Sequence, residues 1–247
     1  MVKLNCDLGE GLDALDAQVM PFLQMANIAC GAHAGDPQRL KKSLELAKAH
    51  AVTCGAHPGY PDRDTMGRRS LALSESALTD TLLSQLTLFQ NLCHQTATTM
   101  AYIKPHGALY NDMMCDLHLF ARVMNILASH CPGIPVLIQA MPSNQEHLHI
   151  ATQLGQTLWF EGFADRAYSP SGRLEARSKP GAVHTDIGII VKQARELTEN
   201  GRVRATNGNW LQIEVDTLCV HSDTQNALTA VKQLHHYLDT HSEGPRV

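Results

Sequence analysis

The stretch Ala-Asn-Ile-Ala-Cys-Gly-Ala-His-Ala-Gly-Asp at residues 26–36 decides the fold. Its short apolar run is typical of a buried strand, and Gly31 lets the backbone turn sharply where that strand stops. Asp36 followed by Pro37 predicts the start of a helix, with the aspartate as N-cap and the proline in the first turn. We therefore expect His33 at the mouth of a strand, beside a helix N-terminus, where α/β proteins carry their active sites.

The same pattern of an apolar run, a histidine and a turn residue occurs three more times. It recurs in residues 51–59, 101–107 and 217–223, which contain His57, His106 and His221. A single histidine in a fold is usually a structural residue. Four histidines at equivalent strand ends predict one shared polar site.

Side chains alternate in polarity along each predicted strand. In residues 2–8, Asn5 and Asp7 share one side and apolar residues share the other. The outer face of a barrel strand packs on helices, whereas the inner face turns polar near the catalytic mouth, so we expect the polar side to point inward. The same alternation assigns an inner position to Asn27, His33, His57, Lys104, His106, Cys219 and His221.

Apolar residues with helical spacing separate these strands. Four helices are predicted at 37–50, 75–93, 115–129 and 224–239. A fifth begins with a capping box of Ser143 and Glu146 and ends at Gly155, and a sixth runs from 187 and ends at Gly201. Two more strands are predicted at 135–140 and 157–163, and a hairpin joins 203–205 to 210–213 around Asn207-Gly208.

Alternating strands and helices predict an α/β protein with a mostly parallel sheet. Seven or eight such units in this length favour a closed or nearly closed TIM-like (β/α) barrel, with an open doubly wound sheet as the alternative. We expect a single domain over residues 1–247, with a loose polar tail at 240–247.

Composition excludes several classes of protein. The net charge is −4 and there is no basic block, so we expect no nucleic acid and no membrane surface as partner. We find neither a signal peptide nor a run of 18 apolar residues. Seven scattered cysteines without a C-x-x-C pair favour the reducing cytoplasm over a disulfide framework, and they argue against a thiolate zinc site.

Polar residues at the strand ends suggest specific chemistry. Asp7 and Glu10 flank the end of the first strand and suit a base, an acid or a metal ligand, although Asp7 alternatively only orients a histidine. Lys104 on an inner face needs an anionic partner, because burying it alone costs several kcal/mol. That partner is either a substrate carboxylate or phosphate, or a structural ion pair with Asp7 or Glu161.

Two further segments contain candidate binding residues. Arg68 and Arg69, in the charged loop 60–70, suit a bidentate anion clamp, or else a solvated loop with local Asp–Arg pairs. Tyr110 and Asn111 offer hydrogen bonds to a substrate.

At the end of the strand at 157–163 and just beyond it, Glu161, Asp165, Arg166 and Tyr168 suit a polar pocket wall, or a tight turn held by Asp–Arg pairing. Cys219 fits core packing better than a nucleophile. The sequence has no phosphate-binding loop, no dinucleotide fingerprint and no G-x-S-x-G elbow.

Five of these motifs, at residues 5–10, 26–36, 55–62, 104–111 and 163–168, together resemble the LamB/YcsF family. The resemblance runs in order from residue 3 to about 238. Met66 stands where the family usually has Phe before Gly-Arg-Arg, and Ser222 stands where it has Gly.

The resemblance implies a 5-oxoprolinase activity, in which 5-oxoproline and water give L-glutamate while ATP is hydrolysed. It implies 5-oxoprolinase subunits B and C as partners. It also implies a distorted, seven-stranded, TIM-like barrel related to polysaccharide deacetylases. With no phosphate loop in the chain, ATP is expected on one of the partners or at an unrecognised site.

Within that framework each candidate receives a hypothetical role. Catalytic proton transfer falls to Asp7, His33, His57 and His106. Substrate binding falls to Asn27, Arg68, Arg69, Lys104, Tyr110, Asn111, Glu161, Asp165, Arg166 and His221. Two alternatives remain: a metal-dependent, deacetylase-like hydrolase with Asp7, His33 and His57 as ligands of a divalent ion, and a non-catalytic component that delivers 5-oxoproline to its partners.

Overall fold

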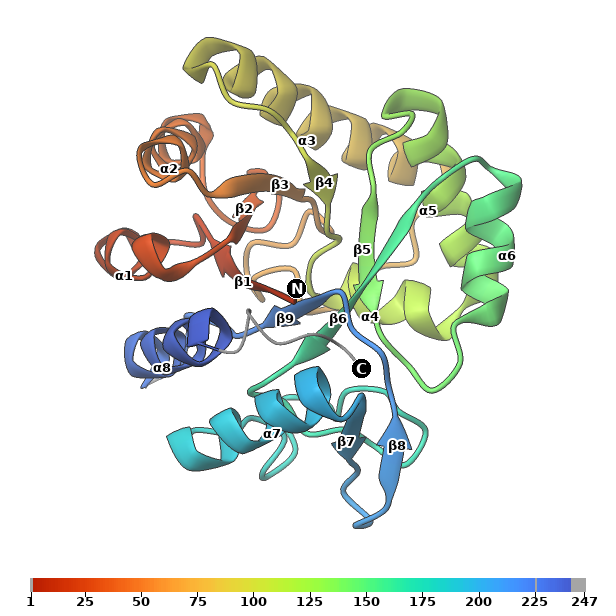
Figure 1. Ribbon diagram of the computed structural model, residues 1–247. Coiled ribbons are helices and arrows are strands. Elements are labelled where there is room, and N and C mark those ends of the chain that lie inside the picture. Colours follow the sequence, from red (N-terminus) through yellow and green to blue (C-terminus); the bar gives the residue numbers. More distant parts are fainter. Residues whose placement is uncertain (1, 225, 241–247) are drawn as a thin grey trace.

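Seven parallel strands close into a barrel in the computed structural model, which describes residues 2–224 and 226–240 (Figure 1). In their order around the ring the strands are β1 (Lys3–Leu8), β2 (Met25–Ala29), β3 (Thr53–His57), β4 (Tyr102–Ile103), β5 (Val136–Gln139), β6 (Leu158–Phe163) and β9 (Thr217–Cys219). The ring closes because β9 pairs with β1 on one side and with β6 on the other. The predicted TIM-like barrel is therefore confirmed, with seven strands, and the open-sheet alternative is wrong.

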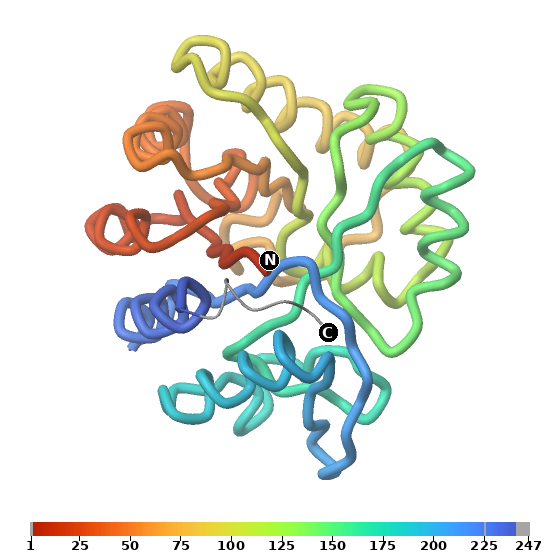
Figure 2. The backbone as a smooth tube through the Cα atoms, in the orientation of Figure 1, coloured from red at the N-terminus to blue at the C-terminus, as the bar shows by residue number. Residues whose placement is uncertain are grey.

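Helices surround the strands, as the course of the chain in Figure 2 shows. They are α1 (Asp13–Val19), the short 3₁₀ helix η1 (Met20–Phe22), α2 (Pro37–Ala49), α3 (Glu75–Thr96), α4 (Gly107–Cys115), α5 (Leu117–His130), α6 (Gln145–Gln153), α7 (Ile187–Glu199) and α8 (Ala227–Thr240). The sequence did not predict α1, η1 and α4. The last of these begins at a Pro-His-Gly run that resembles a turn.

Helix starts follow capping chemistry in one predicted case and depart from it in another. The Asp36 side chain accepts hydrogen bonds from the backbone N–H groups of the first turn of α2, as predicted. The predicted capping box at Ser143 is wrong, because the N-cap residue of α6 is Asn144. The Asn144 amide turns back instead, accepting from Met141 N at 2.8 Å and donating to Gln139 O at 3.1 Å.

The barrel interior is layered, as the alternation predicted. Near the amino ends of the strands, Met25, Tyr102 and Leu137 form a small apolar cluster. The Tyr102 ring occupies the space that a side chain at Gly55 would need, because a Cβ there would lie 2.2 Å from the ring. Above this cluster, polar side chains form a hydrogen-bonded layer, and in it the Tyr102 hydroxyl donates to Asn27 Oδ1 at 2.7 Å. The outward-facing residues of β1, such as Leu4 and Cys6, belong to the main hydrophobic core under the helices.

An antiparallel hairpin of β7 (Arg202–Arg204) and β8 (Trp210–Gln212) interrupts the alternation before β9. Figure 1 shows it beside α7, outside the ring of strands. The predicted Asn207-Gly208 turn connects the two strands, and Gly208 takes the left-handed backbone that this turn requires, with φ +87°. The hairpin prediction is therefore confirmed.

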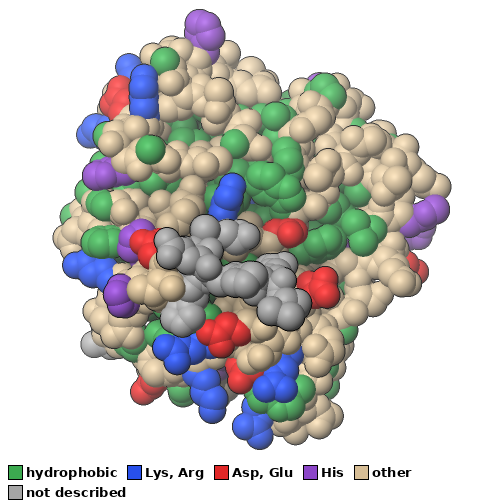
Figure 3. All heavy atoms as spheres, viewed as in Figure 1, with side chains coloured by type: hydrophobic (Ala, Val, Ile, Leu, Met, Phe, Trp, Pro, Cys, Tyr) green, Lys and Arg blue, Asp and Glu red, His purple; other side chains and the backbone are tan. Residues whose placement is uncertain are grey.

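Surface and cysteine features complete the fold. Within the described part of the chain, no helix combines the length and apolarity needed to cross a bilayer. Charged side chains of both signs are intermixed on the face drawn in Figure 3. All seven cysteines are free thiols. The predicted loose tail falls, from residue 241 onward, outside the described residues.

Candidate active site

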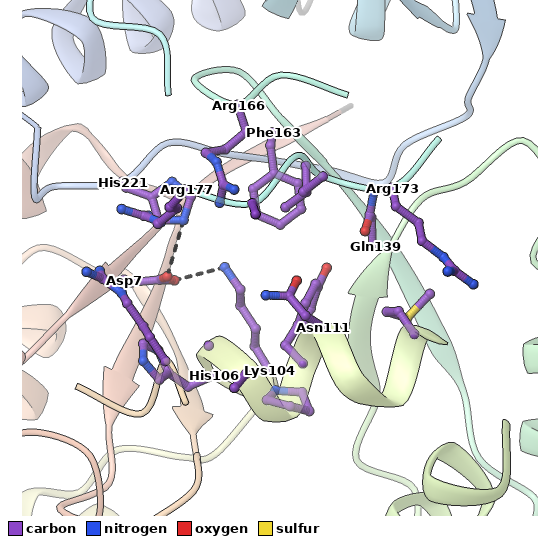
Figure 4. Close-up of a pocket in the computed structure, with 18 of the residues that line it drawn as sticks. Asp7, Lys104, His106, Asn111, Gln139, Phe163, Arg166, Arg173, Arg177 and His221 are labelled. Atoms are coloured by element: carbon purple, nitrogen blue, oxygen red, sulfur yellow. Dashed lines mark hydrogen bonds and ion pairs between the residues drawn. The ribbon is translucent and has the colours of Figure 1, made fainter. Parts of the chain in front are cut away.

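A cavity of about 500 Å³ opens at the carboxyl ends of the barrel strands (Figure 4). Its wall combines strand-end residues, the first turns of α4 and the irregular segment that follows β6. Predicted site residues in this wall are Asp7, His57, Arg68, Lys104, His106, Tyr110, Asn111, Arg166 and His221. The strand ends therefore converge on one polar basin.

Asp7, at the end of β1, lies at the centre of the polar contacts. Its Oδ1 accepts hydrogen bonds from Asn27 Nδ2 and Lys104 Nζ, each at 2.8 Å. Its Oδ2 lies 3.4 Å from His57 Nε2 and 3.9 Å from His221 Nε2. Burial alone raises the pKa of this carboxyl, but Lys104, His57 and His221 hold the pKa well below its usual value. Asp7 is therefore an anion at neutral pH, with one oxygen turned toward the histidines.

Lys104 bridges two carboxylates inside the barrel. Its Nζ lies 2.8 Å from Asp7 Oδ1, 3.1 Å from Glu161 Oε2 and 3.3 Å from Cys219 Sγ. Burial alone lowers the pKa of the ammonium, yet Asp7, Cys219 and Glu161 raise it well above its ordinary value. Of the two alternatives for Lys104, the structural ion pair is present, and the ammonium also lines the cavity. Burial raises the pKa of the Cys219 thiol, which suits core packing.

Three histidines pack together beside Asp7. The His33 and His106 rings stack with centroids 3.7 Å apart, and His57 meets His106 edge-on at 4.7 Å. Glu10 Oε1 lies 3.2 Å from both His33 Nε2 and His106 Nδ1. Burial lowers the pKa of His33 to about 3, and burial with the two neighbouring rings holds the pKa of His106 well below its usual value. These stacked rings are therefore uncharged at neutral pH.

His221 and Asp165 form a hydrogen-bonded dyad on the opposite wall. His221 Nδ1 donates to Asp165 Oδ2 at 2.9 Å, and the His221 backbone N–H donates to the same oxygen at 3.0 Å. Burial favours a higher pKa for the Asp165 carboxyl, but these contacts bring it below its ordinary value. The Phe163 ring stacks on His221 with centroids 5.8 Å apart. The imidazole is held so that Nε2 faces the cavity and Asp7.

Four arginines line the cavity, and Figure 4 shows Arg166, Arg173 and Arg177 on the side facing Lys104 and His106. Arg68 and Arg177 both pair with Asp223 Oδ2, at 2.7 and 2.8 Å. Arg166 donates to two backbone carbonyls. Among the described residues, neither Arg166 nor Arg173 makes an ion pair with a carboxylate. The rim, meaning Arg68, Arg166, Arg173 and Arg177 with Asp223, therefore carries more positive charge than its carboxylate neutralises.

Some predicted site residues lie away from the cavity surface. Asn27, Glu161 and Asp165 stand one layer behind it, where they hold Asp7, Lys104 and His221. His33 is fully buried behind His106. Arg69 is mostly exposed and pairs with Asp62 at 3.1 Å, so the Asp–Arg pairing expected as the alternative for this loop holds for Arg69.

Several residues that line the cavity have no role in the assignment made from the sequence, among them Glu10, Gln139, Phe163, Arg173 and Arg177. Glu10 was weighed as a candidate, and its place directly after β1 is the signal that favours it. Arg173 and Arg177 belong to an irregular segment without periodicity, so no pattern in the sequence points to them.

Side chains of metal-ligand type form three groups among the described residues: Asp7–His57–His106, Asp7–Cys219–His221 and Glu10–His33–His106. The expected combination of Asp7, His33 and His57 is not one of them. Because His33 stacks on the far side of His106 and faces Glu10, His106 takes its place next to Asp7 and His57.

Comparison with known proteins agrees with the motifs. The model of the LamB/YcsF family matches residues 2–244. Relatives include the 5-oxoprolinase A-subunit 2 of Pseudomonas putida, 43% identical over 96% of this chain and 93% of its own length, and the 5-oxoprolinase A-subunit of Chromohalobacter salexigens, 44% identical over 96% of each chain. Among solved structures, the lactam utilization protein from Thermus thermophilus is similar, with a TM-score of 0.87 and 32% identity over 98% of this chain and 97% of its own. The chain thus belongs to the LamB/YcsF family.

Proposed function

We propose that this chain is the A-subunit of a 5-oxoprolinase. It opens the lactam ring of 5-oxoproline to give L-glutamate, acting with subunits B and C while ATP is hydrolysed to ADP and phosphate. The names of the relatives support the substrate. The cavity supports the chemistry, because it joins an anion-binding rim to a group that can move protons.

The observation that carries the proposal is the arrangement of arginines around the cavity. 5-Oxoproline carries one carboxylate on a five-membered ring. A guanidinium without a carboxylate partner is a strong and geometrically specific ligand for such a group. Arg173 and Arg166 meet this requirement among the described residues, and Asn111 lines the same space. The carboxylate binds at the rim, and the ring carbonyl points toward Asp7 and His221.

The Asp165–His221 dyad supplies proton transfer in the proposed reaction. A water oxygen bonds to the ring carbonyl carbon, the carbon–nitrogen bond breaks, and the nitrogen takes up a proton. His221 Nε2 accepts the proton of the attacking water and returns it to the nitrogen, while Asp165 holds the tautomer and orientation of the ring. A lactam is a poor electrophile, so transfer of the ATP γ-phosphoryl group to its carbonyl oxygen precedes attack. Breaking of the carbon–nitrogen bond then leaves an acyl phosphate, and a second water hydrolyses it to the carboxylate of glutamate and inorganic phosphate. The nucleotide is proposed to bind on one of the partners.

Substitutions in the reconstituted complex test these roles. We expect His221→Gln to slow ATP-coupled glutamate release by at least about 100-fold, the usual range for a lost acid–base group. Arg173→Met should weaken 5-oxoproline binding by about 10- to 100-fold through the lost charged hydrogen bonds. Arg69→Met is the matched control, because Arg69 pairs with Asp62 outside the cavity.

If His221→Gln and Arg173→Met both retain the rate and affinity of the unmodified complex, the site assignment is wrong. If His221→Gln alone keeps the full rate while Arg173→Met loses affinity, a non-catalytic binding component is the better description. Both measurements use glutamate and ADP formation, with isothermal titration for affinity.

A metal-dependent amidohydrolase is the second candidate function. The grouping of Asp7, His57 and His106 favours it. Glutamate release by this chain alone, with a divalent ion and without ATP, distinguishes it from the ATP-dependent reaction.

We also propose that the chain works as one domain in a reducing compartment such as the cytoplasm. The seven free thiols support such a compartment.

A further inference from the structure

Two histidines in the cavity wall, His57 and His106, contact more hydrogen-bond acceptors than two neutral imidazoles can donate to. His57 Nδ1 lies 2.7 Å from the Lys104 carbonyl oxygen, and His106 Nε2 lies 2.8 Å from the Met66 carbonyl oxygen. Carbonyl oxygens only accept hydrogen bonds, so both of these nitrogens carry hydrogen. Each neutral ring has a single N–H. With both rings neutral, the remaining nitrogens, His57 Nε2 and His106 Nδ1, face each other at 2.9 Å with lone pairs only.

Two carboxylates face the same pair of nitrogens. Asp7 Oδ2 lies 3.4 Å from His57 Nε2, and Glu10 Oε1 lies 3.2 Å from His106 Nδ1. Each nitrogen lone pair thus lies close to the other and to an anionic oxygen, and these groups repel one another unless a cation or a shared proton lies between them. Two imidazoles with two carboxylates are a donor set that binds divalent first-row metal ions and whose negative charge such an ion balances.

We propose that Asp7, Glu10, His57 and His106 bind one divalent transition-metal ion, with Zn²⁺ as the probe. Tetrahedral zinc with bonds of about 2.0–2.2 Å holds its ligand atoms about 3.3 Å apart. Four ligand separations lie around this value: 2.9 Å between His57 Nε2 and His106 Nδ1, 3.4 Å between Asp7 Oδ2 and His57 Nε2, 3.2 Å between Glu10 Oε1 and His106 Nδ1, and 3.9 Å between Glu10 Oε1 and His57 Nε2. Asp7 and Glu10 belong to different groups of metal-ligand side chains, so binding draws the two carboxylates toward the same ion.

The surroundings of the four ligands match those of metal sites. Metal-binding histidines usually donate their second N–H to a carbonyl or a carboxylate, which fixes the tautomer, and both rings do so here. Asp7 Oδ1 is already occupied by Asn27 and Lys104, which leaves Oδ2 for the ion. Glu10 is oriented by His33, whose Nε2 lies 3.2 Å from its Oε1.

The backbone around the rings also restricts their position. Met66, whose carbonyl holds His106, takes the left-handed conformation with φ +55°, which is strained for a residue other than glycine. A Cβ at Gly67 would lie 2.8 Å from His33 Cβ and 2.9 Å from His106 Cδ2. The strained backbone at Met66 and the missing side chain at Gly67 thus together fix the position of the His106 ring, whose Nδ1 is a proposed ligand.

Three of the four ligands form one of the metal-ligand groups described above, and Glu10 lines the cavity beside them, so a bound ion faces the substrate space. Because four side chains already complete a tetrahedral shell, the ion would polarise a carbonyl oxygen or a water only as a fifth ligand. The proposal rests on these residues and not on the proposed function. Its test accordingly measures binding without turnover.

The experiment uses the full chain, stripped with EDTA and titrated with Zn²⁺ by calorimetry and with Co²⁺ by visible absorption. We expect one equivalent of ion, and an absorption spectrum of Co²⁺ in a tetrahedral or five-coordinate site. Glu10→Gln and His106→Gln should each weaken binding at least about 10- to 100-fold. His118→Gln, a change at an exposed histidine, is the matched control and should bind like the unmodified chain. Circular dichroism of the metal-free variants checks that they are folded.

Absence of stoichiometric binding to the unmodified chain at micromolar concentrations overturns the proposal, and so does binding that Glu10→Gln and His106→Gln both leave unchanged. In either case a proton shared by His57 and His106 replaces the ion, and ¹⁵N chemical shifts of the ring nitrogens identify it. Glutamate release in the complex remains a separate measurement, so failure of the metal site and failure of the proposed reaction are distinguishable.

Discussion

Replacing Lys104 with methionine tests how the interior of the barrel holds its charges. The Lys104 side chain is only 3% exposed and lies between Asp7 at 2.8 Å and Glu161 at 3.1 Å. Methionine keeps the unbranched shape of the side chain, one atom shorter, and removes the charge, so two buried carboxylates lose their common partner. Breaking a buried ion pair from one side costs about 3–5 kcal/mol, and we expect Lys104→Met to lower the free energy of unfolding by that amount.

Urea denaturation at neutral pH with EDTA present measures this loss. A second variant, Lys104→Met with Glu161→Gln, removes one of the two unpaired charges and should recover about 1–2 kcal/mol. Lys179→Met is the control, because Lys179 pairs with Glu175 at the surface with its side chain 63% exposed, and such pairs contribute at most about 1 kcal/mol. A loss for Lys104→Met no larger than that of the control, or a double variant no more stable than the single one, would refute the reasoning.

Three further predictions concern stability. Burial raises the pKa of Asp16 from 3.8 to about 6, so its contribution to stability is present below about pH 4 and is lost as the pH rises through 6. Asp16→Asn should therefore raise the free energy of unfolding by about 1–2 kcal/mol at pH 8 and leave it unchanged at pH 4, measured by chemical denaturation at both pH values. Gly55→Ala places a methyl group 2.2 Å from the Tyr102 ring and should lower the free energy of unfolding by about 1–3 kcal/mol or more. Gly133→Ala has open space around it and should cost only the backbone strain of a positive φ, so an equal fall in melting temperature for the two variants contradicts the reasoning. Asp36→Ala removes the cap of α2 and should cost about 1–2 kcal/mol in the same thermal assay, and no change would show that the cap is dispensable.

The barrel and the convergence of its polar residues were predictable from the sequence. Side chains alternate with a period of two along a strand, so Asn5 and Asp7 had to share the inner face once Leu4 and Cys6 were assigned to the core. The strand ends of a parallel barrel meet at one rim. The histidines that follow those strands were therefore expected near one another, and the contacts of His57, His106 and His221 around Asp7 agree with that expectation.

Details that depend on rotation of a single side chain were not predictable. The sequence places His33 and His106 alike after strands, but only the structure shows that His33 lies behind the other ring and faces Glu10. Likewise, Arg68 and Arg69 are adjacent, yet one lines the cavity and the other pairs outside it. Neighbouring residues point in different directions, and spacing alone does not say which direction leads to the site.

Irregular segments were the other source of error. The start of α4 follows a proline and coincides with Gly107, so local turn signals outweighed helical ones. Ser143 satisfied a capping pattern, but Asn144 one position later offered the loop two hydrogen bonds, and the helix begins after it.

The shortness of β4 indicates where the barrel opens first. This strand has two residues and is joined to β5 through a single residue pair, Ile103 with Val136, whereas β1 and β2 share four pairs. Hydrogen–deuterium exchange should therefore start along the β4–β5 seam while β1 and β2 stay protected. Lys104 comes directly after Ile103 in the chain. A transient separation of β4 from β5 therefore displaces the ammonium that neutralises Asp7, while the helices packed around the barrel stay in place.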